Sequence, residues 1–280
     1  MKPQFIDAHS HVNFSAFDAD REETIKRAQE AGVWVINVGT QKDTSKSAVE
    51  LAEKYSEGVY AIIGLHPIHT SVSHHDKEEL SEEAKAFNSR EEIFDKDFYR
   101  NLAKSKKVVG IGECGLDFFG KPEKDVREKQ ETAFRGQIEL AIELDLPLMI
   151  HCREAYSDAL VILNEYKKIA GDKLRGDFHF FAGDIETAQK ILDLGFNISF
   201  TGVITFARDY EKLVKYVPLG RMMSETDCPY VTPVPNRGKR NEPANVRDVV
   251  GKIARIRGED SEKVRVELLE NALKFFKLTV

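Results

Sequence analysis

The stretch AFRGQIELAIELDLPLMI, residues 133–150, decides the fold. Its first half has apolar residues at three- and four-residue spacing, which is typical of one face of an α-helix: they are Phe134, Ile138, Ala141 and Ile142. Pro147 cannot continue a helix, and the apolar run around it, residues 146–150, predicts a buried strand. The stretch therefore predicts a helix that leads directly into a strand.

The same alternation runs through the whole chain. Short apolar runs predict eight strands, at residues 5–9, 33–38, 59–64, 108–112, 146–150, 176–180, 197–200 and 221–225. Helical patterns predict helices at Arg21–Ala31, Thr44–Tyr55, Phe98–Ala103, Arg127–Leu144, Ala155–Ala170, Ile185–Leu194, Tyr210–Tyr216, Asn245–Arg257 and Ser261–Phe276. The repeated order of strand and helix predicts an α/β fold, a single (β/α)8 TIM barrel. An open doubly wound sheet is the competing architecture, and the count of eight strands favours the barrel.

We expect one domain over residues 1–280, because no low-complexity tract or Gly/Ser linker interrupts the alternation. One connection is longer than a single crossover helix needs. It follows the third predicted strand and is strongly acidic. We interpret roughly residues 69–97 as a helical insertion over or beside the barrel mouth.

The composition limits the classes of function. Hydrophobic residues make up 41% and charged residues 31% of the chain, enough for a large core and a well-solvated surface. The formal net charge of −6 argues against a broad grip on nucleic acid, since proteins that follow the phosphate backbone usually carry a basic excess. No apolar run approaches the roughly 18 residues that cross a bilayer. We therefore expect a cytoplasmic protein that has no contact with membranes.

Five of the eight histidines share one position, at or just past the C-terminal end of a predicted strand: they are His9, His11, His66, His151 and His179. The C-terminal ends of barrel strands converge on one face, where the active sites of such enzymes are built. Glu113 and Asp227 end the fourth and eighth predicted strands, so we expect both acids at this face. The pattern gathers scattered residues into one cluster.

This cluster predicts a metal centre, because imidazole nitrogens and carboxylate oxygens are metal ligands. Six candidate ligands are too many for one tetrahedral zinc and suit two ions roughly 3.5–4 Å apart with a bridging carboxylate. Glu113, central in the strand order, is the natural bridge. A single histidine at a strand end is more often a hydrogen-bonded polar residue, so only the whole set favours a metal. The six are His9, His11, Glu113, His151, His179 and Asp227.

Each of the three cysteines directly follows one of these candidate ligands in the sequence. Successive side chains of a strand point to opposite faces. If the ligands point to the barrel axis, the thiols of Cys114, Cys152 and Cys228 point to the helix layer. We expect them to be small buried hydrophobes rather than ligands or nucleophiles.

Six motifs resemble, in order, those of the TatD-type deoxyribonucleases of the metal-dependent hydrolase superfamily. They are FIDAHSH, AIIGLHP, VVGIGECGLDFF, LMIHCREA, SETDCPY and NRGKRNEPANV. In the wider amidohydrolase superfamily a carboxylated lysine often bridges two metals after strand four. Here Glu113 holds that place, which points to the TatD branch. The resemblance extends from residue 5 to the closing ELLENALKFF.

The resemblance implies a role for each matching position. One divalent ion (Mg, Mn or Zn) would be held by His9, His11, Glu113 and Asp227. The second would be held by Glu113, His151 and His179. The substrate-side positions that would contact phosphate are His66 and Arg153. The residues that would orient ligands are Glu225, Asn241 and Glu242.

The leading hypothesis is a divalent-metal-dependent deoxyribonuclease with Glu113 and Asp227 as catalytic carboxylates. Arg237, Lys239 and Arg240 would add positive charge near the mouth, or would form an ordinary solvated turn. The acidic surface favours DNA single strands or ends as the substrate, and the resemblance implies 3′-to-5′ exonuclease action. Two alternatives stay open. One is a metal-dependent amide or ester hydrolase or deaminase, and the other is a barrel that binds metal or a partner without turnover.

Overall fold

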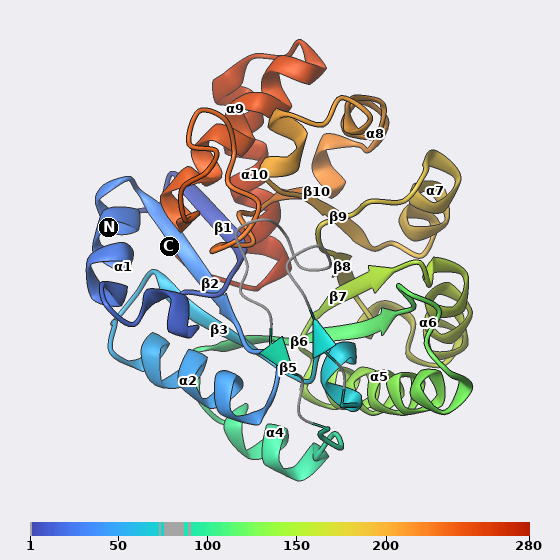
Figure 1. Cartoon of the computed structure of the whole chain (residues 1–280). Coiled ribbons are helices and arrows are strands. Elements are labelled where there is room, and N and C mark those ends of the chain that lie inside the picture. Colours follow the sequence, from blue (N-terminus) through green and yellow to red (C-terminus); the bar gives the residue numbers. More distant parts are fainter. Residues whose placement is uncertain (1, 73, 76–86, 89–90) are drawn as a thin grey trace.

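The structure, a computed structural model, describes residues 2–72, 74–75, 87–88 and 91–280. Its main feature is an eight-stranded parallel sheet that curls into a barrel (Figure 1). In order around the sheet the strands are β1 Phe5–Ser10, β2 Val33–Val38, β3 Val59–Ile63, β6 Val108–Asp117, β7 Leu148–Arg153, β8 Gly176–Phe178, β9 Asn197–Phe200 and β10 Met222–Ser224. The predicted barrel is confirmed.

The barrel closes between β1 and the segment that follows β10. Ser10 and Cys228 form a parallel bridge, and the His11 amide donates to the Cys228 carbonyl oxygen at 2.9 Å. The Asp227 amide donates to the His9 carbonyl oxygen, also at 2.9 Å. Closure therefore depends on the segments that carry three of the six candidate ligands.

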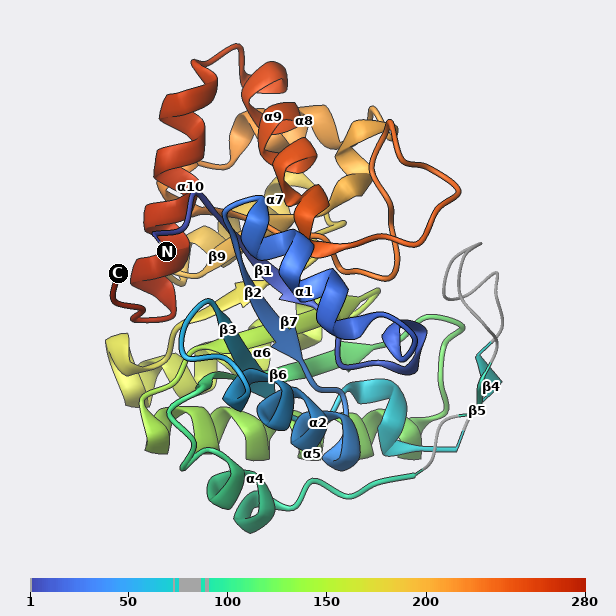
Figure 2. The ribbon, with the colours of Figure 1, turned by 90° about the vertical axis from the view of Figure 1, so that its left-hand side faces the viewer.

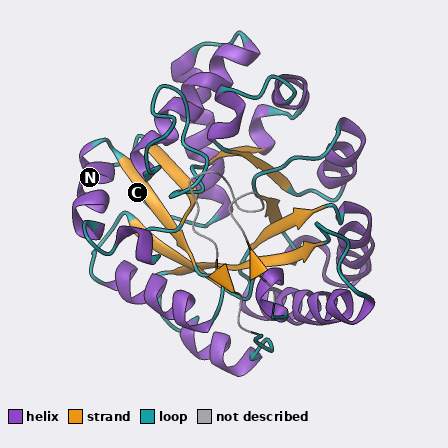
Figure 3. Cartoon of the chain, viewed as in Figure 1, coloured by secondary structure: helices purple, strands orange, loops and turns teal. Residues whose placement is uncertain are grey.

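Helices cover the outside of the barrel (Figure 3). They are α1 Arg21–Glu30, α2 Lys42–Glu53, α4 Lys96–Leu102, α5 Lys124–Leu144, α6 Tyr156–Ala170, α7 Ile185–Asp193, α8 Tyr210–Tyr216, α9 Val246–Arg257 and α10 Ser261–Phe275. Their apolar faces and the outward side chains of the strands form the larger of two buried clusters. Within the described part of the chain, no helix combines the length and the apolar character that crossing a membrane requires.

The inside of the barrel is apolar at the end where the strands begin. Ile36, Ile62 and Met149 belong to an inner cluster that includes Phe275 and Phe276 from the end of α10. Figure 2 shows α10 at the opposite end of the barrel from the short strands β4 and β5. Because α10 seals one end, the polar residues of the barrel interior lie towards the other end, the mouth.

Strand β6 is longer than predicted, and this corrects the position of Glu113. The sequence placed Glu113 at the end of a strand, but it lies inside β6, where the pairing with β7 is irregular. Gly112 and Gly115 have φ of 153° and 137°. A Cβ on Gly115 would lie 2.0 Å from the carbonyl oxygen of His151, so only glycine permits this approach of the strands. Glycine is depleted in strands, which is why the prediction stopped early.

Two glutamines of α5 hold the strand ends that lead to the mouth. The Gln130 side chain accepts from the Asp117 amide at 2.9 Å and donates to the Asp117 carbonyl oxygen at 3.0 Å. Gln137 does the same for Leu65, with both distances at 2.9 Å. Two helical turns separate the glutamines, so one face of α5 fixes both strand ends.

The helical insertion predicted for residues 69–97 lies partly outside the described residues, because residues 73, 76–86 and 89–90 are not described. The described parts include a short antiparallel pair, β4 His74–His75 and β5 Phe87–Asn88, which was not predicted. The first residues of α4 also fall in this range. The helical character of the insertion stays a prediction.

Candidate metal centre

Glu113 lies at the centre of the mouth, and its two carboxylate oxygens face different histidines. Oε2 lies 3.4 Å from Nε2 of His9 and 3.8 Å from Nε2 of His11. Oε1 lies 2.7 Å from Nε2 of His179 and 3.2 Å from Nδ1 of His151. Burial opposes the charged form, but the surrounding imidazoles outweigh it and hold the pKa of Glu113 well below its ordinary value. One ionised carboxylate thus faces two separate pairs of ring nitrogens.

On one side of Glu113, His9, His11 and Asp227 converge. The Nδ1–H of His11 donates to the carbonyl oxygen of Val38 at 2.9 Å, so Nε2 of a neutral ring carries the lone pair. That atom lies 3.1 Å from Nε2 of His9 and 3.4 Å from Oδ1 of Asp227. Two ring nitrogens this close beside a carboxylate need a proton or a metal ion between them, which fits a cation site.

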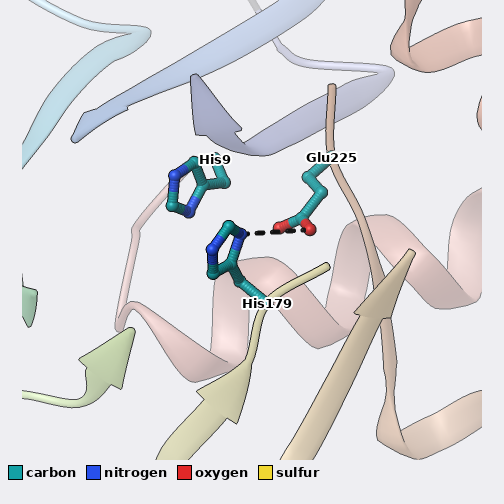
Figure 4. A group of neighbouring side chains, drawn as sticks. All are labelled: His9, His179 and Glu225. Atoms are coloured by element: carbon teal, nitrogen blue, oxygen red, sulfur yellow. Dashed lines mark ion pairs between the residues drawn. The ribbon is translucent and has the colours of Figure 1, made fainter. Parts of the chain in front are cut away.

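On the other side, His179 lies between Glu113 and Glu225. Figure 4 shows Glu225 facing Nδ1 of His179, at 3.6 Å, while the ring stacks on His9 with centroids 3.9 Å apart. Burial would lower the pKa of His179, but Glu113 and Glu225 outweigh it and raise this pKa well above its usual value. In the absence of metal the ring therefore holds a proton, which a metal ion would replace.

Glu225 itself lies close enough to His9 and His179 to share an ion with them. Its oxygens, however, accept the Phe180 amide at 2.6 Å and the Ser199 hydroxyl at 2.8 Å. Glu225 is fully buried and one of its oxygens faces Nδ1 of His179, so it is placed to orient that ring and to leave Nε2 for a metal ion.

His66 is also buried against Glu113, but its protonation makes it a donor. Nδ1 accepts the Ile68 amide at 3.2 Å, so the proton of the neutral ring is on Nε2, 3.3 Å from Oε1 of Glu113. Burial lowers the pKa of His66 to about 4, which keeps the ring neutral. His66, Glu113 and His151 are close enough to share an ion. A ligand would need a lone pair on Nε2, so we assign donation to His66.

Asp117 is a site residue that the sequence did not single out. Its Oδ2 accepts from Nε2 of His151 at 2.9 Å, and Nε of Arg153 lies 3.0 Å from both of its oxygens. Burial opposes ionisation, yet His151 and Arg153 hold the pKa of Asp117 below its ordinary range. The sequence did contain a signal for Asp117, because residues 113, 115 and 117 lie on the same face of a strand. The predicted strand ended at residue 112, so this alternation was not recognised.

A cavity of about 270 Å³ opens above these residues. All the predicted metal ligands except His9 line it, as do His66 and Arg153, together with the aromatic rings of Phe14, Phe180 and Tyr230. The Phe14 ring stacks on His11, with centroids 4.3 Å apart. Burial, with Asp227 and Glu113 nearby, raises the pKa of Tyr230 to about 12, so its hydroxyl stays protonated. The cavity combines a polar floor with aromatic walls.

Comparisons with known proteins agree with this geometry. Residues 6–277 match the family described as TatD related DNase. The chain belongs to the TatD family. The uncharacterised metal-dependent hydrolase YabD of Bacillus subtilis is 37% identical over 277 residues, 98% of this chain and 99% of its own length. The Pantoea vagans protein named 3′-5′ ssDNA/RNA exonuclease TatD is 32% identical over 282 residues, with 98% and 99% covered.

Solved structures of the TatD family support the same assignment. The TatD homologue YjjV of Escherichia coli superimposes with a TM-score of 0.81 at 27% identity over the whole of both chains. A TatD family hydrolase from Entamoeba histolytica, at 24% identity and a TM-score of 0.77, shows the shared fold. The predicted resemblance is confirmed, and the chain is a metal-dependent hydrolase of the TatD family.

Two of the three cysteines lie where the strand alternation predicts, because Cys114 and Cys228 are buried in the outer core cluster. Cys152 is only partly buried: it packs against this cluster but also lines the cavity. Burial raises the pKa of each thiol. The thiols are therefore protonated and unreactive at neutral pH, as expected.

Two alternatives were left open for the basic residues of the loop after β10: added charge at the mouth, or an ordinary solvated turn. Both Nη atoms of Arg240 donate to Asp20 at 2.7 Å, and its guanidinium stacks on Phe17 at 4.2 Å. Arg237 stacks on the Phe206 ring, also at 4.2 Å. The first alternative is wrong for Arg240, because a guanidinium paired in this way joins the loop to α1 and adds no net charge at the centre.

Asn241 and Glu242 also hold this loop, and only Asn241 acts next to a candidate ligand. The side-chain amide of Asn241 donates to the carbonyl oxygens of Thr226 and Tyr230 at 3.0 and 2.7 Å, on either side of Asp227. Glu242 instead accepts two bonds of 2.8 Å from Arg27. The implied orienting role thus fits Asn241, whereas Glu242 fastens the loop to α1.

Proposed function

We propose that this protein hydrolyses phosphodiester bonds of DNA with two divalent ions at the mouth of the barrel. The observation that carries the proposal is the arrangement at Glu113, whose two oxygens face two separate groups of candidate ligands. A carboxylate placed in this way suits a two-metal centre. The Pantoea vagans relative, named an exonuclease for single-stranded DNA and RNA, supports the choice of substrate.

We assign each ion to one side of Glu113. The residues that would hold the first ion are His9, His11, Glu113 and Asp227. Those that would hold the second are Glu113, His151 and His179. Imidazole and carboxylate ligands suit Mg, Mn or Zn, which differ in preferred geometry.

The protein residues have separate tasks in the reaction. Ions held at these positions would supply a hydroxide near neutral pH and neutralise charge that grows on the phosphate. Asp227 accepts the proton of the attacking water. Arg153, directed by Asp117, and His66, protonated on Nε2, donate hydrogen bonds to phosphate oxygens. The phosphate is thereby held in place while the water attacks.

We propose single strands or strand ends as the substrate, with cleavage from the 3′ end. The cavity of about 270 Å³ is too small for a duplex and is of the size of one small ligand. The net charge of −6 gives no extended basic surface for a long footprint. The cytoplasmic location and single-domain organisation stay predictions.

The proposal is tested with purified protein and labelled single-stranded DNA. With Mn²⁺ or Mg²⁺ we expect mononucleotides to accumulate from the 3′ end, and EDTA to stop the reaction. An Asp20→Asn variant is the control, because Asp20 pairs with Arg240 away from the cavity. Intact DNA under all metal conditions, with hydrolysis of an amide or ester panel instead, would overturn the nuclease assignment.

Phe14→Leu should lower kcat/KM for single-stranded DNA about 5- to 150-fold, because stacking of a base on an aromatic ring contributes roughly 1–3 kcal/mol. Phe14 lines the cavity and stacks on His11. The control is Phe206→Leu, since that ring is 43% exposed and does not line the cavity. If an oligonucleotide with an abasic 3′ end suffers the same loss as one with a terminal base, the stacking role is wrong.

Metal affinity should rise with pH, and still rise above pH 6.5. The pKa values of His11, His151 and His179 are all raised, because neighbouring carboxylates outweigh burial. Protons therefore compete with the metal at a higher pH than ordinary histidines allow, and binding releases them. Calorimetry with Mn²⁺ in buffers of different ionisation enthalpy measures that release. An affinity that does not change between about pH 6 and 8 would contradict the prediction.

A further inference from the structure

Asp117 joins a candidate metal ligand to a candidate phosphate contact. Its Oδ2 accepts the Nε2–H of His151 at 2.9 Å. Nε of Arg153 donates to the same carboxylate, 3.0 Å from each oxygen. The side chain of Asp117 is only 4% exposed, so solvent does not replace these bonds. One buried carboxylate therefore contacts both the candidate metal ligand His151 and the candidate phosphate contact Arg153.

The surroundings of Asp117 hold it in place. Its backbone is held from both sides by the Gln130 amide of α5, and its Oδ1 accepts the Phe119 amide at 3.1 Å. Asp117 pairs with Arg153, and Gly115 with His151, in the register of β6 and β7. Because both donors come from alternate positions of one strand, they reach the carboxylate from the same face.

The contact with Asp117 fixes the tautomer of His151. A carboxylate only accepts, so Nε2 keeps its proton, and when the ring loses its other proton to a metal ion the lone pair is on Nδ1. Nδ1 is the atom that faces Glu113, at 3.2 Å. Without Asp117, the neutral ring is free to place its proton on Nδ1, which would block the metal position. Such carboxylate partners typically change metal affinity by about 10- to 100-fold.

The same contact directs Arg153. Its guanidinium lies between the Asp117 carboxylate and the Phe119 ring, whose centroid is 4.3 Å from Cζ. Since Nε is bound to Asp117, the plane of the guanidinium and the direction of its terminal nitrogens are set. Arg153 lines the cavity, so this direction determines how it meets a phosphate there.

We propose that Asp117 is a positioning residue with two effects. It sets the metal affinity of the site that contains His151, and it orients Arg153 for binding a phosphate of the substrate. The second half of the proposal rests on the proposed DNA hydrolysis, whereas the first half rests only on the proposed ligand role of His151. The two halves are therefore tested with different measurements.

The metal half is tested by calorimetric titration of Mn²⁺ into metal-free protein. Asp117→Asn should weaken one of the two binding events about 10- to 100-fold, because the amide must turn an N–H towards His151 or Arg153. Asp117→Ser removes the carboxylate, and its shorter hydroxyl no longer accepts from both His151 and Arg153, so it should have an effect of the same kind. The matched control is Asp20→Asn, which also removes an arginine-paired carboxylate, and it should leave both affinities unchanged. Unchanged Mn²⁺ affinity in folded Asp117→Asn and Asp117→Ser would overturn this half.

The substrate half is tested at saturating metal with a double-mutant cycle. Asp117→Asn and Arg153→Met should each raise KM about tenfold or more, and the double variant should show no further increase, since Asp117 acts through Arg153. Arg153→Met should keep the wild-type Mn²⁺ affinity. Losses that multiply in the double variant would overturn the coupling. If wild-type protein cleaves no DNA at all, the proposed function fails, while the titration still decides the metal half.

Discussion

Glu113→Gln is expected to abolish metal-dependent turnover and to weaken the binding of both ions. Within the described chain, Glu113 is the only carboxylate that faces both the pair His9 and His11 and the pair His151 and His179. An amide keeps the shape but brings one oxygen and no charge, so one side must face an N–H group. Losing several kcal/mol of charge stabilisation corresponds to a fall in kcat/KM of about 10³-fold or more.

The readout that separates this effect from misfolding is thermal unfolding with and without Mn²⁺. A ligand at about 100 times its Kd stabilises a protein by roughly 2.7 kcal/mol, which raises the Tm of the wild type. Metal-free Glu113→Gln should unfold in one transition and gain nothing from Mn²⁺. Asp20→Asn should gain as much as the wild type. A Glu113→Gln variant that still binds two ions would show that Glu113 is not the bridge.

The barrel was predictable from sequence because its signals are local. A helical stripe such as that of residues 133–142, ended by Pro147, needs no knowledge of the rest of the chain. The count of eight strands followed, and the structure confirms it. The predicted end of β6 was wrong. Gly112 and Gly115 allow β6 to lie very close to β7, and no pattern within β6 reveals this contact.

The candidate site was predictable where position on a strand decides it, and not where partners decide it. His9, His151 and Asp227 follow from strand ends. The donor role of His66 follows from the Ile68 amide on Nδ1, a contact made by the turn after β3. The pairing of Arg240 was missed for the same reason, since its partner Asp20 is distant in sequence. Such pairings depend on packing between elements.

Asp227→Asn should lower kcat about 10²- to 10⁴-fold while most of the metal affinity remains. The backbone of Asp227 has φ of 55°, a conformation that asparagine adopts more readily than most residues. The hydrogen bond from the backbone amide of residue 227 to the His9 carbonyl oxygen, at 2.9 Å, does not involve the side chain. The substitution therefore leaves barrel closure intact. The asparagine oxygen can still be a ligand, but the amide cannot accept a proton, and loss of a general base has this magnitude.

The residual rate of Asp227→Asn should rise with pH, because hydroxide from solution takes over the role of the missing proton acceptor. Together the two variants separate metal binding from proton transfer. Glu113→Gln should lose the ions, whereas Asp227→Asn should keep them and lose turnover. Mn²⁺ titration and a pH–rate profile on both variants make the comparison. If Asp227→Asn loses its ions as completely as Glu113→Gln does, Asp227 is a metal ligand alone. The proton would then have to leave through another group, and Tyr230, protonated up to a pKa of about 12, cannot be that acceptor at neutral pH.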